Sequence, residues 1–136
     1  MLVKALELSI VLIVISYIFL NFIQISENLY IFYREKYQFL ERFLVGRFLI
    51  KFLTESETLS YTTCNLNENF SYLINGNLNI TDIIKNAELL NNVKIEIEDL
   101  ENKEKIFELG NIKKDFVSFS RVCNYNGKLI KINVLV

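Results

Sequence analysis

An uncharged apolar stretch near the N-terminus constrains this chain more than any other feature. From Leu8 to Ser26 the sequence holds no charged residue, and Glu7 and Glu27 stand at its two ends. A helix of about 19 residues rises about 28 Å, which is close to the ~30 Å hydrocarbon core of a bilayer. The stretch therefore predicts a helix that crosses a membrane.

Two amide side chains, Asn21 and Gln24, lie inside this stretch, and each is unfavourable if it faces lipid alone. Two interpretations stay open. The helix is a plain anchor whose polar residues lie near one interface, or it packs against copies of itself that hydrogen-bond the amides. An ordinary secretory signal fits less well, because the apolar run is long and no small-residue cleavage site follows it.

The helical pattern continues beyond the apolar stretch. From Glu27 to Leu53 there is no proline, and Gly46 is the one glycine. Large apolar residues recur there at spacings of three and four, which marks one broad face. The members of this face are Leu29, Phe32, Tyr33, Tyr37, Leu40, Phe43, Leu44 and Phe48. We expect one unbroken helix from near Leu6 to near Leu53, covered by a globular head, by neighbouring protomers or by both.

The periodicity of the sequence changes after residue 56. Residues 6–26 are the apolar membrane or filament-core helix, residues 27–56 its amphipathic continuation, and residues 57–136 a β-rich head. The predicted fold class is α+β: a long N-terminal helix followed by a small antiparallel β-rich head with one short helix.

Several short runs in the head are rich in β-branched and aromatic residues or alternate between apolar and polar residues. The expected strands are residues 59–64, 70–74, 77–80, 93–98, 105–109, 116–124 and 129–136. Asn75-Gly76 and Asn126-Gly127 predict tight hairpin turns. Thr81 or Asp82 would cap a short helix that ends near Leu90. We expect residues 105–109 to pair antiparallel with residues 93–98, and the last strand to lie inside the sheet.

The composition excludes several classes of function. The chain has no histidine, a formal net charge of −1 and four scattered glycines. It therefore lacks the usual general base, a basic field for nucleic acid and a glycine-rich phosphate loop. The acidic residues between Glu96 and Glu104 alternate with lysine and apolar residues, as on a solvated strand face and turn. We expect no enzyme, metal site, cofactor or nucleic-acid partner.

Cys64 and Cys123 are the two cysteines, and both fall on predicted strands. They are either joined or buried as free thiols. A bond between them would close a loop of about 60 residues and contribute about 4 kcal/mol, which is large for a small head. We expect the disulfide, which fits an oxidising compartment outside the cytoplasm.

Two triplets match the acceptor pattern for N-glycosylation: Asn69-Phe70-Ser71 and Asn79-Ile80-Thr81. A chain this rich in asparagine also produces such triplets by chance, and both readings stay open. Asn69 and Asn79 are the candidate modification sites.

The N-terminal pattern resembles that of archaeal type IV pilin-like proteins. A short leader, the pair Lys4-Ala5, then Leu6 and a near-continuous apolar helix look like a class III signal peptide and its cut site. The resemblance implies that a prepilin-peptidase-like enzyme removes residues 1–5. Glu7 resembles the acidic residue that helps to set register between neighbouring helices, although it stands second after the cut, where many members carry it about fifth.

The family resemblance also implies a function. The chain would be a structural subunit of an archaeal type IV filament, inserted in the cell membrane before assembly, with its head at the cell surface for adhesion. Its partners would be copies of itself or other pilin subunits, and Glu7, Asn21 and Gln24 would act in assembly. The end of the chain, from Arg121 to Val134, also resembles the closing hairpin of small pilin-like proteins from methanogens.

Two other functions stay open. The first is an uncleaved single-pass membrane protein with an extracytoplasmic β domain, such as an accessory subunit of a surface filament or motor. The second is a membrane scaffold that faces the cytoplasm. Four basic residues that follow the apolar run support the scaffold under the positive-inside rule: Arg34, Lys36, Arg42 and Arg47.

Overall fold

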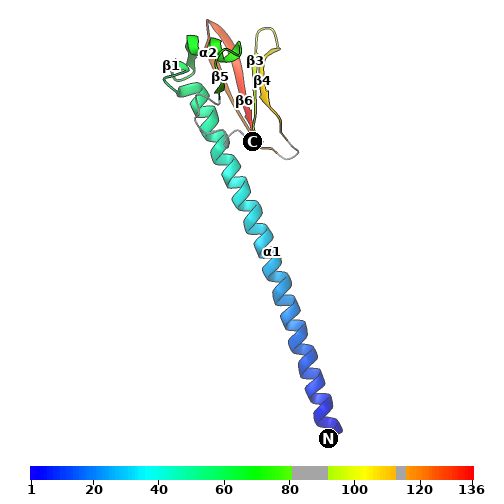
Figure 1. Ribbon diagram of the computed structural model, residues 1–136. Helices are drawn as coiled ribbons and strands as arrows, with labels where there is room; N and C mark the ends of the chain where they lie inside the picture. The colour runs from blue at the N-terminus through cyan, green and yellow to red at the C-terminus, as the bar shows by residue number, and fades with distance from the viewer. Residues whose placement is uncertain (81–91, 113–115) are drawn as a thin grey trace. The chain divides into compact units, whose positions relative to one another are not determined.

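The computed structural model describes residues 1–80, 92–112 and 116–136. In chain order its elements are α1 (Leu2–Glu55), β1 (Ser60–Thr62), β2 (Asn65–Leu66), α2 (Glu68–Ile74), β3 (Lys94–Asp99), β4 (Glu104–Gly110), β5 (Ser118–Tyr125) and β6 (Lys128–Leu135) (Figure 1). The fold class is α+β, as the sequence predicts. The chain divides into two compact units, residues 1–40 and residues 41–136, so the last turns of α1 belong to the unit that contains the sheet.

Helix α1 is unbroken over 54 residues, which confirms the prediction of one continuous helix and extends it at both ends. The chain contains no proline, and Gly46 lies inside the helix without a break. In the unit formed by residues 1–40, every residue is exposed except half-buried Asn21. The apolar side chains of this unit are therefore largely exposed.

The six strands form one sheet in the order β1-β2-β5-β6-β3-β4. The pair β2 and β5 is parallel, and every other neighbouring pair is antiparallel. Strand β6 lies between β5 and β3, which confirms that the last strand runs inside the sheet. The β3–β4 pair confirms the predicted antiparallel partner, and Asn126-Gly127 forms the predicted turn between β5 and β6, with φ of 50° and 79°.

One face of this sheet carries the core of the second unit. On β3, Ile95 and Ile97 are buried while the residues between them are half-buried, as the alternation predicts. The register places Ile95 opposite Val134 and Ile97 opposite Ile132. Successive strands therefore contribute apolar side chains to the same face.

The last turns of α1 cover this face (Figure 1). Leu49 and Leu53 are completely buried in the same core as the β3 and β6 side chains. Burial of two leucines contributes roughly 1.5–3 kcal/mol each. Leu44 and Phe48, two members of the broad apolar face seen in the sequence, stay 56% and 48% exposed. The sheet thus leaves these two members of the broad face largely uncovered.

Gly46 explains how α1 comes so close to the sheet. A Cβ atom at this position would lie 2.6 Å from Cδ2 of Phe119 and 2.8 Å from Cγ2 of Val136. Both distances are shorter than ordinary van der Waals contact, so a side chain at residue 46 requires its neighbours to move. Phe43, one turn earlier, packs edge-on against Phe119 with ring centroids 5.3 Å apart.

The predicted hairpin of residues 70–74 and 77–80 is wrong, because the first segment is helix α2. The side chain of Asn67 accepts a hydrogen bond from the backbone N–H of Asn69 and caps the helix. Phe70 and Leu73, three residues apart, are both buried, as on one side of a helical turn.

Asn75-Gly76 ends helix α2 instead of joining two strands. Gly76 has a φ of +74°, its N–H donates to the carbonyl of Leu73, and the next N–H donates to the carbonyl of Tyr72. This is the geometry of a glycine that closes a helix. Residues 77–79 form no strand, and the short helix expected from Thr81 or Asp82 to Leu90 lies outside the described residues.

We predict that Gly46→Leu destabilises the head by about 1 kcal/mol. Overpacking against Phe119 and Val136 costs about 1–3 kcal/mol and should outweigh the ~1 kcal/mol of helix propensity gained when glycine is replaced. Thermal unfolding of the full chain in a nonionic detergent, followed by near-UV circular dichroism, measures the change. The control is Arg47→Leu, at the adjacent exposed position, which should leave the midpoint within about 0.5 kcal/mol of the parent. Equal midpoints for the two variants would contradict the close approach at residue 46.

Candidate functional site

The predicted processing residues lie in the first turns of α1. Lys4, Ala5, Leu6 and Glu7 are all helical and exposed. The carbonyl of Ala5 lies within helix α1, and it also accepts a hydrogen bond from the Ser9 hydroxyl at 2.9 Å. The family resemblance places the cleavage at the peptide bond between Ala5 and Leu6. The side chains on both sides of this bond are exposed, and its backbone is helical.

One of the two amides of the apolar stretch, that of Asn21, is partly accommodated by the helix itself. The Nδ2 atom of Asn21 donates to the carbonyl oxygen of Tyr17 at 2.8 Å, and the Ser26 hydroxyl donates to the carbonyl of Phe22 at 2.9 Å. Each of these bonds lowers the penalty of a polar group in lipid, because its donor is no longer unpaired. Gln24 is exposed. Asn21 therefore depends less on a hydrogen bond from a partner helix than the sequence alone indicates.

Helix α1 is long and apolar enough to cross a membrane, and its most apolar window has no buried residue. The exposed apolar surface does not stop at the end of this window. Large apolar side chains, each at least 48% exposed, continue along the helix and include Leu29, Tyr30, Ile31, Phe32, Tyr33, Tyr37, Phe39, Leu40, Leu44 and Phe48. Continuous apolar surface of this extent marks an interaction site on proteins in water. We call residues 29–48 the juxtamembrane segment, and it is the candidate assembly surface.

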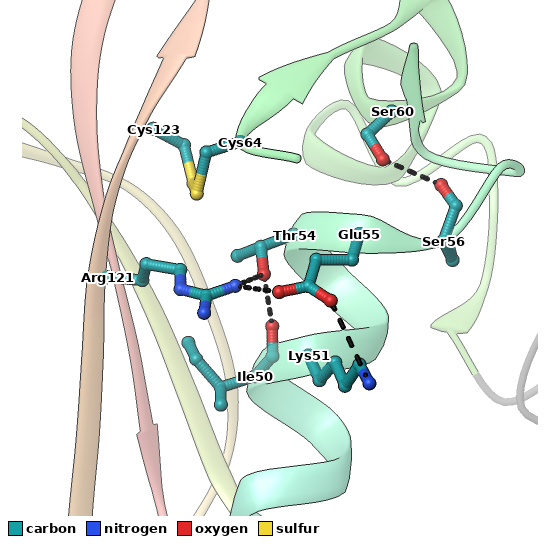
Figure 2. Close-up of polar contacts among 9 residues, drawn as sticks. All are labelled: Ile50, Lys51, Thr54, Glu55, Ser56, Ser60, Cys64, Arg121 and Cys123. Atoms are coloured by element: carbon teal, nitrogen blue, oxygen red, sulfur yellow. Dashed lines mark hydrogen bonds and ion pairs between the residues drawn. A yellow bond between two sulfur atoms is a disulfide. The ribbon is translucent and has the colours of Figure 1, made fainter. Parts of the chain in front are cut away.

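Cys64 and Cys123 form the predicted disulfide, with Cα atoms 4.5 Å apart and a sequence separation of 59. The bond joins the segment between β1 and β2 to β5 (Figure 2). Two backbone hydrogen bonds accompany it: Cys64 N–H donates to the carbonyl of Thr54 at 2.8 Å, and Asn124 N–H donates to the carbonyl of Cys64 at 2.9 Å. The disulfide therefore fastens the chain that follows α1 to the sheet, at a site where a loop of this length contributes about 4 kcal/mol.

Arg121 joins the end of α1 to the sheet, and sequence reasoning did not identify this role. Its Nη1 atom donates to the Thr54 hydroxyl at 2.8 Å and to the carboxylate of Glu55 (Figure 2). The Thr54 hydroxyl in turn donates to the carbonyl of Ile50 at 2.8 Å. The Arg121 guanidinium lowers the pKa of Glu55 below its ordinary value of 4.5, and Lys51, 4.0 Å away, acts in the same direction.

A signal for this contact exists in the alternation of β5. Phe119, Arg121 and Cys123 occupy every second position and share the face of the sheet that meets α1. An arginine on the core-facing side of a strand needs a carboxylate or carbonyl partner. The identity of the partner, Glu55, depends on a contact across 66 residues and could not be read from local pattern.

The acidic residues of β3 and β4 pair with lysines. Glu96 Oε1 lies 2.7 Å from Lys94 Nζ and 2.8 Å from Lys105 Nζ, and Lys94 also lies 2.8 Å from Glu108. The Lys105 and Lys94 ammonium groups lower the pKa of Glu96. This arrangement of alternating charges belongs to an exposed strand pair, where such bonds contribute little to stability.

The Asp99 side chain accepts hydrogen bonds from residues of the β3–β4 turn. Its Oδ1 atom accepts the backbone N–H of Glu101 at 2.8 Å, and its Oδ2 atom accepts Nδ2 of Asn102 at 3.0 Å. The bond from the Glu101 N–H is the main cause that lowers the pKa of Asp99. Among the described residues, no group of three or more His, Cys, Asp or Glu side chains could hold a metal ion.

The two glycosylation candidates lie in different surroundings. Asn69 is in the first turn of α2, and its Nδ2 atom, which would carry the glycan, donates to the carbonyl of Thr58 at 2.8 Å. Asn79 is exposed, but Thr81 of its acceptor triplet lies outside the described residues. Modification of either asparagine remains a prediction.

Comparison with protein-family models, with curated proteins and with solved structures found no match.

We predict that Glu55 stabilises the head at neutral pH and loses this effect in acid. Because its folded pKa lies below 4.5, the contribution is complete above that pH and disappears as the pH falls through the lower, folded value. Urea unfolding of Glu55→Gln should show a lower midpoint than the parent at pH 7, and the difference should shrink below about pH 4.

The matched control for this prediction is Glu57→Gln, which removes the same charge two residues away. Glu57 is exposed, and its side chain forms none of the ion pairs found among the described residues. This variant should follow the parent at every pH. A Glu55→Gln midpoint equal to the parent at pH 7 would show that the Arg121 contact contributes nothing.

Proposed function

We propose that this chain is a membrane-anchored, pilin-like structural subunit of an archaeal type IV filament. The observation that carries the proposal is that the two ends of α1 lie in different surroundings. Its first 40 residues form a unit with exposed apolar side chains, and its last turns are built into the core of a disulfide-bonded β head. A helix of this kind can be held in a membrane before assembly and in the core of a filament afterwards.

Each part of the subunit has a mechanical task in this proposal. The apolar half of α1 packs with other subunits, and the juxtamembrane segment extends that packing beyond the bilayer. The Arg121 contacts and the disulfide connect the helix end to β5, so a pull on the head is transmitted to the helix through side chains and a covalent bond. The head faces the cell exterior, where its disulfide is stable, and serves surface display and adhesion. No catalytic step is part of this function.

Processing is the step that defines this class of subunit. Cleavage after Ala5 would free the amine of Leu6 and place it one residue from Glu7. A carboxylate in an apolar filament core requires a partner charge, and the new amine of a neighbouring subunit supplies one. Residues 1–5 would otherwise occupy the space where that amine must sit.

The alternative is an uncleaved single-pass protein with the same extracytoplasmic head, such as an accessory subunit of a surface filament or motor. One observation favours it: α1 begins at Leu2, so the residues on both sides of the proposed cut form one continuous helix. In this alternative Met1–Ala5 stays attached and the helix is an anchor throughout the life of the protein.

We predict that replacement of Ala5 by tryptophan blocks processing, since the peptidase requires a small residue there. Intact-mass analysis of native protein should show loss of residues 1–5 in the parent and retention in Ala5→Trp. The control is Val3→Trp, inside the leader, which should be processed normally. Glu7→Ala should be cut but recovered in sheared surface filaments in lower amounts than the parent. Native protein that keeps Met1–Ala5 and is never found in sheared filaments would reject the pilin-like function in favour of the uncleaved anchor.

A further inference from the structure

One side of the juxtamembrane segment carries a regular apolar seam. Tyr30, Tyr33, Tyr37, Leu40 and Leu44 follow one another at spacings of three, four, three and four residues. All five are more than half exposed, with the three tyrosines at 68%, 64% and 70%. This spacing is the heptad pattern with which two parallel helices pack knobs into holes. We call these five residues the seam.

The same spacing continues back into the membrane-spanning stretch. The positions that extend the seam are Ser9, Leu12, Ser16, Phe19, Ile23 and Ser26. The hydroxyls of Ser9 and Ser26 donate to carbonyl oxygens of α1 itself, both at 2.9 Å. These serines can therefore face another apolar helix without an unpaired donor.

The two amides of the apolar stretch and Glu35 lie away from the seam. In the heptad that places Tyr30 and Tyr37 at position a, Asn21 and Glu35 fall at position f and Gln24 at position b, on the opposite side of the helix. Asn21 and Gln24 are thus outside the surface that the seam defines. A helix that packs on the seam would therefore not hydrogen-bond these two amides.

The charges beside the seam specify the direction of pairing. Lys36 stands at position g and Glu41 at position e of the next heptad, and both are exposed. In a parallel in-register pair, position g of one helix meets position e of the following heptad of the other. Lys36 would then face Glu41 of the second copy, and the symmetric contact would form as well. In an antiparallel pair position g of one helix meets position g of the other, so the contact between Lys36 and Glu41 would not form.

We infer that two copies of this chain pair in parallel and in register through the seam while they are anchored in the membrane. The occupant is a second copy, because a shared bilayer anchor imposes the parallel direction in which Lys36 and Glu41 complement each other. The seam has a strict seven-residue repeat on a helix of 3.6 residues per turn, so the pair winds into a left-handed supercoil. The inference depends on membrane anchorage and not on removal of the leader or entry into a filament.

Cysteine cross-linking tests the pairing directly on the full chain in native membranes. Cys64 and Cys123 are bonded to each other, so an introduced cysteine is the reactive thiol among the described residues. Tyr33→Cys places it on the seam, and Glu35→Cys, two residues further along, places it on the opposite side. Mild oxidation should convert most of Tyr33→Cys to a disulfide-linked dimer on a nonreducing gel and leave Glu35→Cys monomeric.

Three results would overturn the inference. Equal yields from the two positions would show collision without a defined interface, and no dimer from either would show monomers. Cross-linking of Tyr33→Cys only with a seam cysteine further along the helix, in mixed expression with Leu40→Cys or Leu44→Cys, would show a staggered array. Because uncut chains can still cross-link, a negative result here leaves the processing test unaffected, and failure of processing leaves this test informative.

Charge exchange tests the register and direction. In the Tyr33→Cys background, Lys36→Glu should lower the dimer yield at least about twofold at low salt, because each symmetric contact becomes repulsive. The double variant Lys36→Glu, Glu41→Lys should restore the yield. The control Glu35→Lys, away from the seam, should have no effect. Failure of the double variant to restore the yield would reject the parallel in-register pair.

Discussion

The structure depends on the packing of the last turns of α1 against one face of the sheet. Leu49 and Leu53 are completely buried there, in one core with Ile97 of β3 and Ile132 of β6. A sheet of this size exposes an apolar face that must be covered by another layer. Among the described residues α1 is the long helix that provides this layer. The last turns of α1 are therefore part of the head's own folded unit, residues 41–136.

The consequence is that the end of α1 is fixed to the sheet at several points. Hydrogen bonds and a covalent bond add to the apolar packing, since Arg121 binds Thr54 and Glu55 and the disulfide holds the following segment to β5. One side of the helix end belongs to the core of the head, while Tyr37, Leu40 and Leu44 on the preceding turns stay more than half exposed.

Features set by local pattern could be predicted from the sequence. The unbroken α1 follows from the lack of proline, the β3–β4 and β5–β6 pairs from alternation and from the Asn126-Gly127 turn, and the disulfide from two isolated strand cysteines. The error at residues 70–74 has a physical cause: a five-residue apolar run is ambiguous, and the Asn67 cap with buried Phe70 and Leu73 decides for a helix. Three features could not be predicted: the side of α1 that packs on the sheet, the role of Gly46 and the Arg121–Glu55 contact. Each depends on contacts between segments that are far apart in the sequence, so no local pattern reveals it.

The most direct test of this account compares two fragments of the head that differ only in the helix end. Residues 41–136 contain the last turns of α1, and residues 57–136 lack them. If the helix completes the core, the longer fragment should unfold cooperatively on heating and show dispersed amide resonances. The shorter fragment should show neither property, because the core face that Leu49 and Leu53 cover would be open to water. Cooperative unfolding of residues 57–136 at a midpoint similar to that of residues 41–136 would contradict the central claim that helix and head form one folded unit.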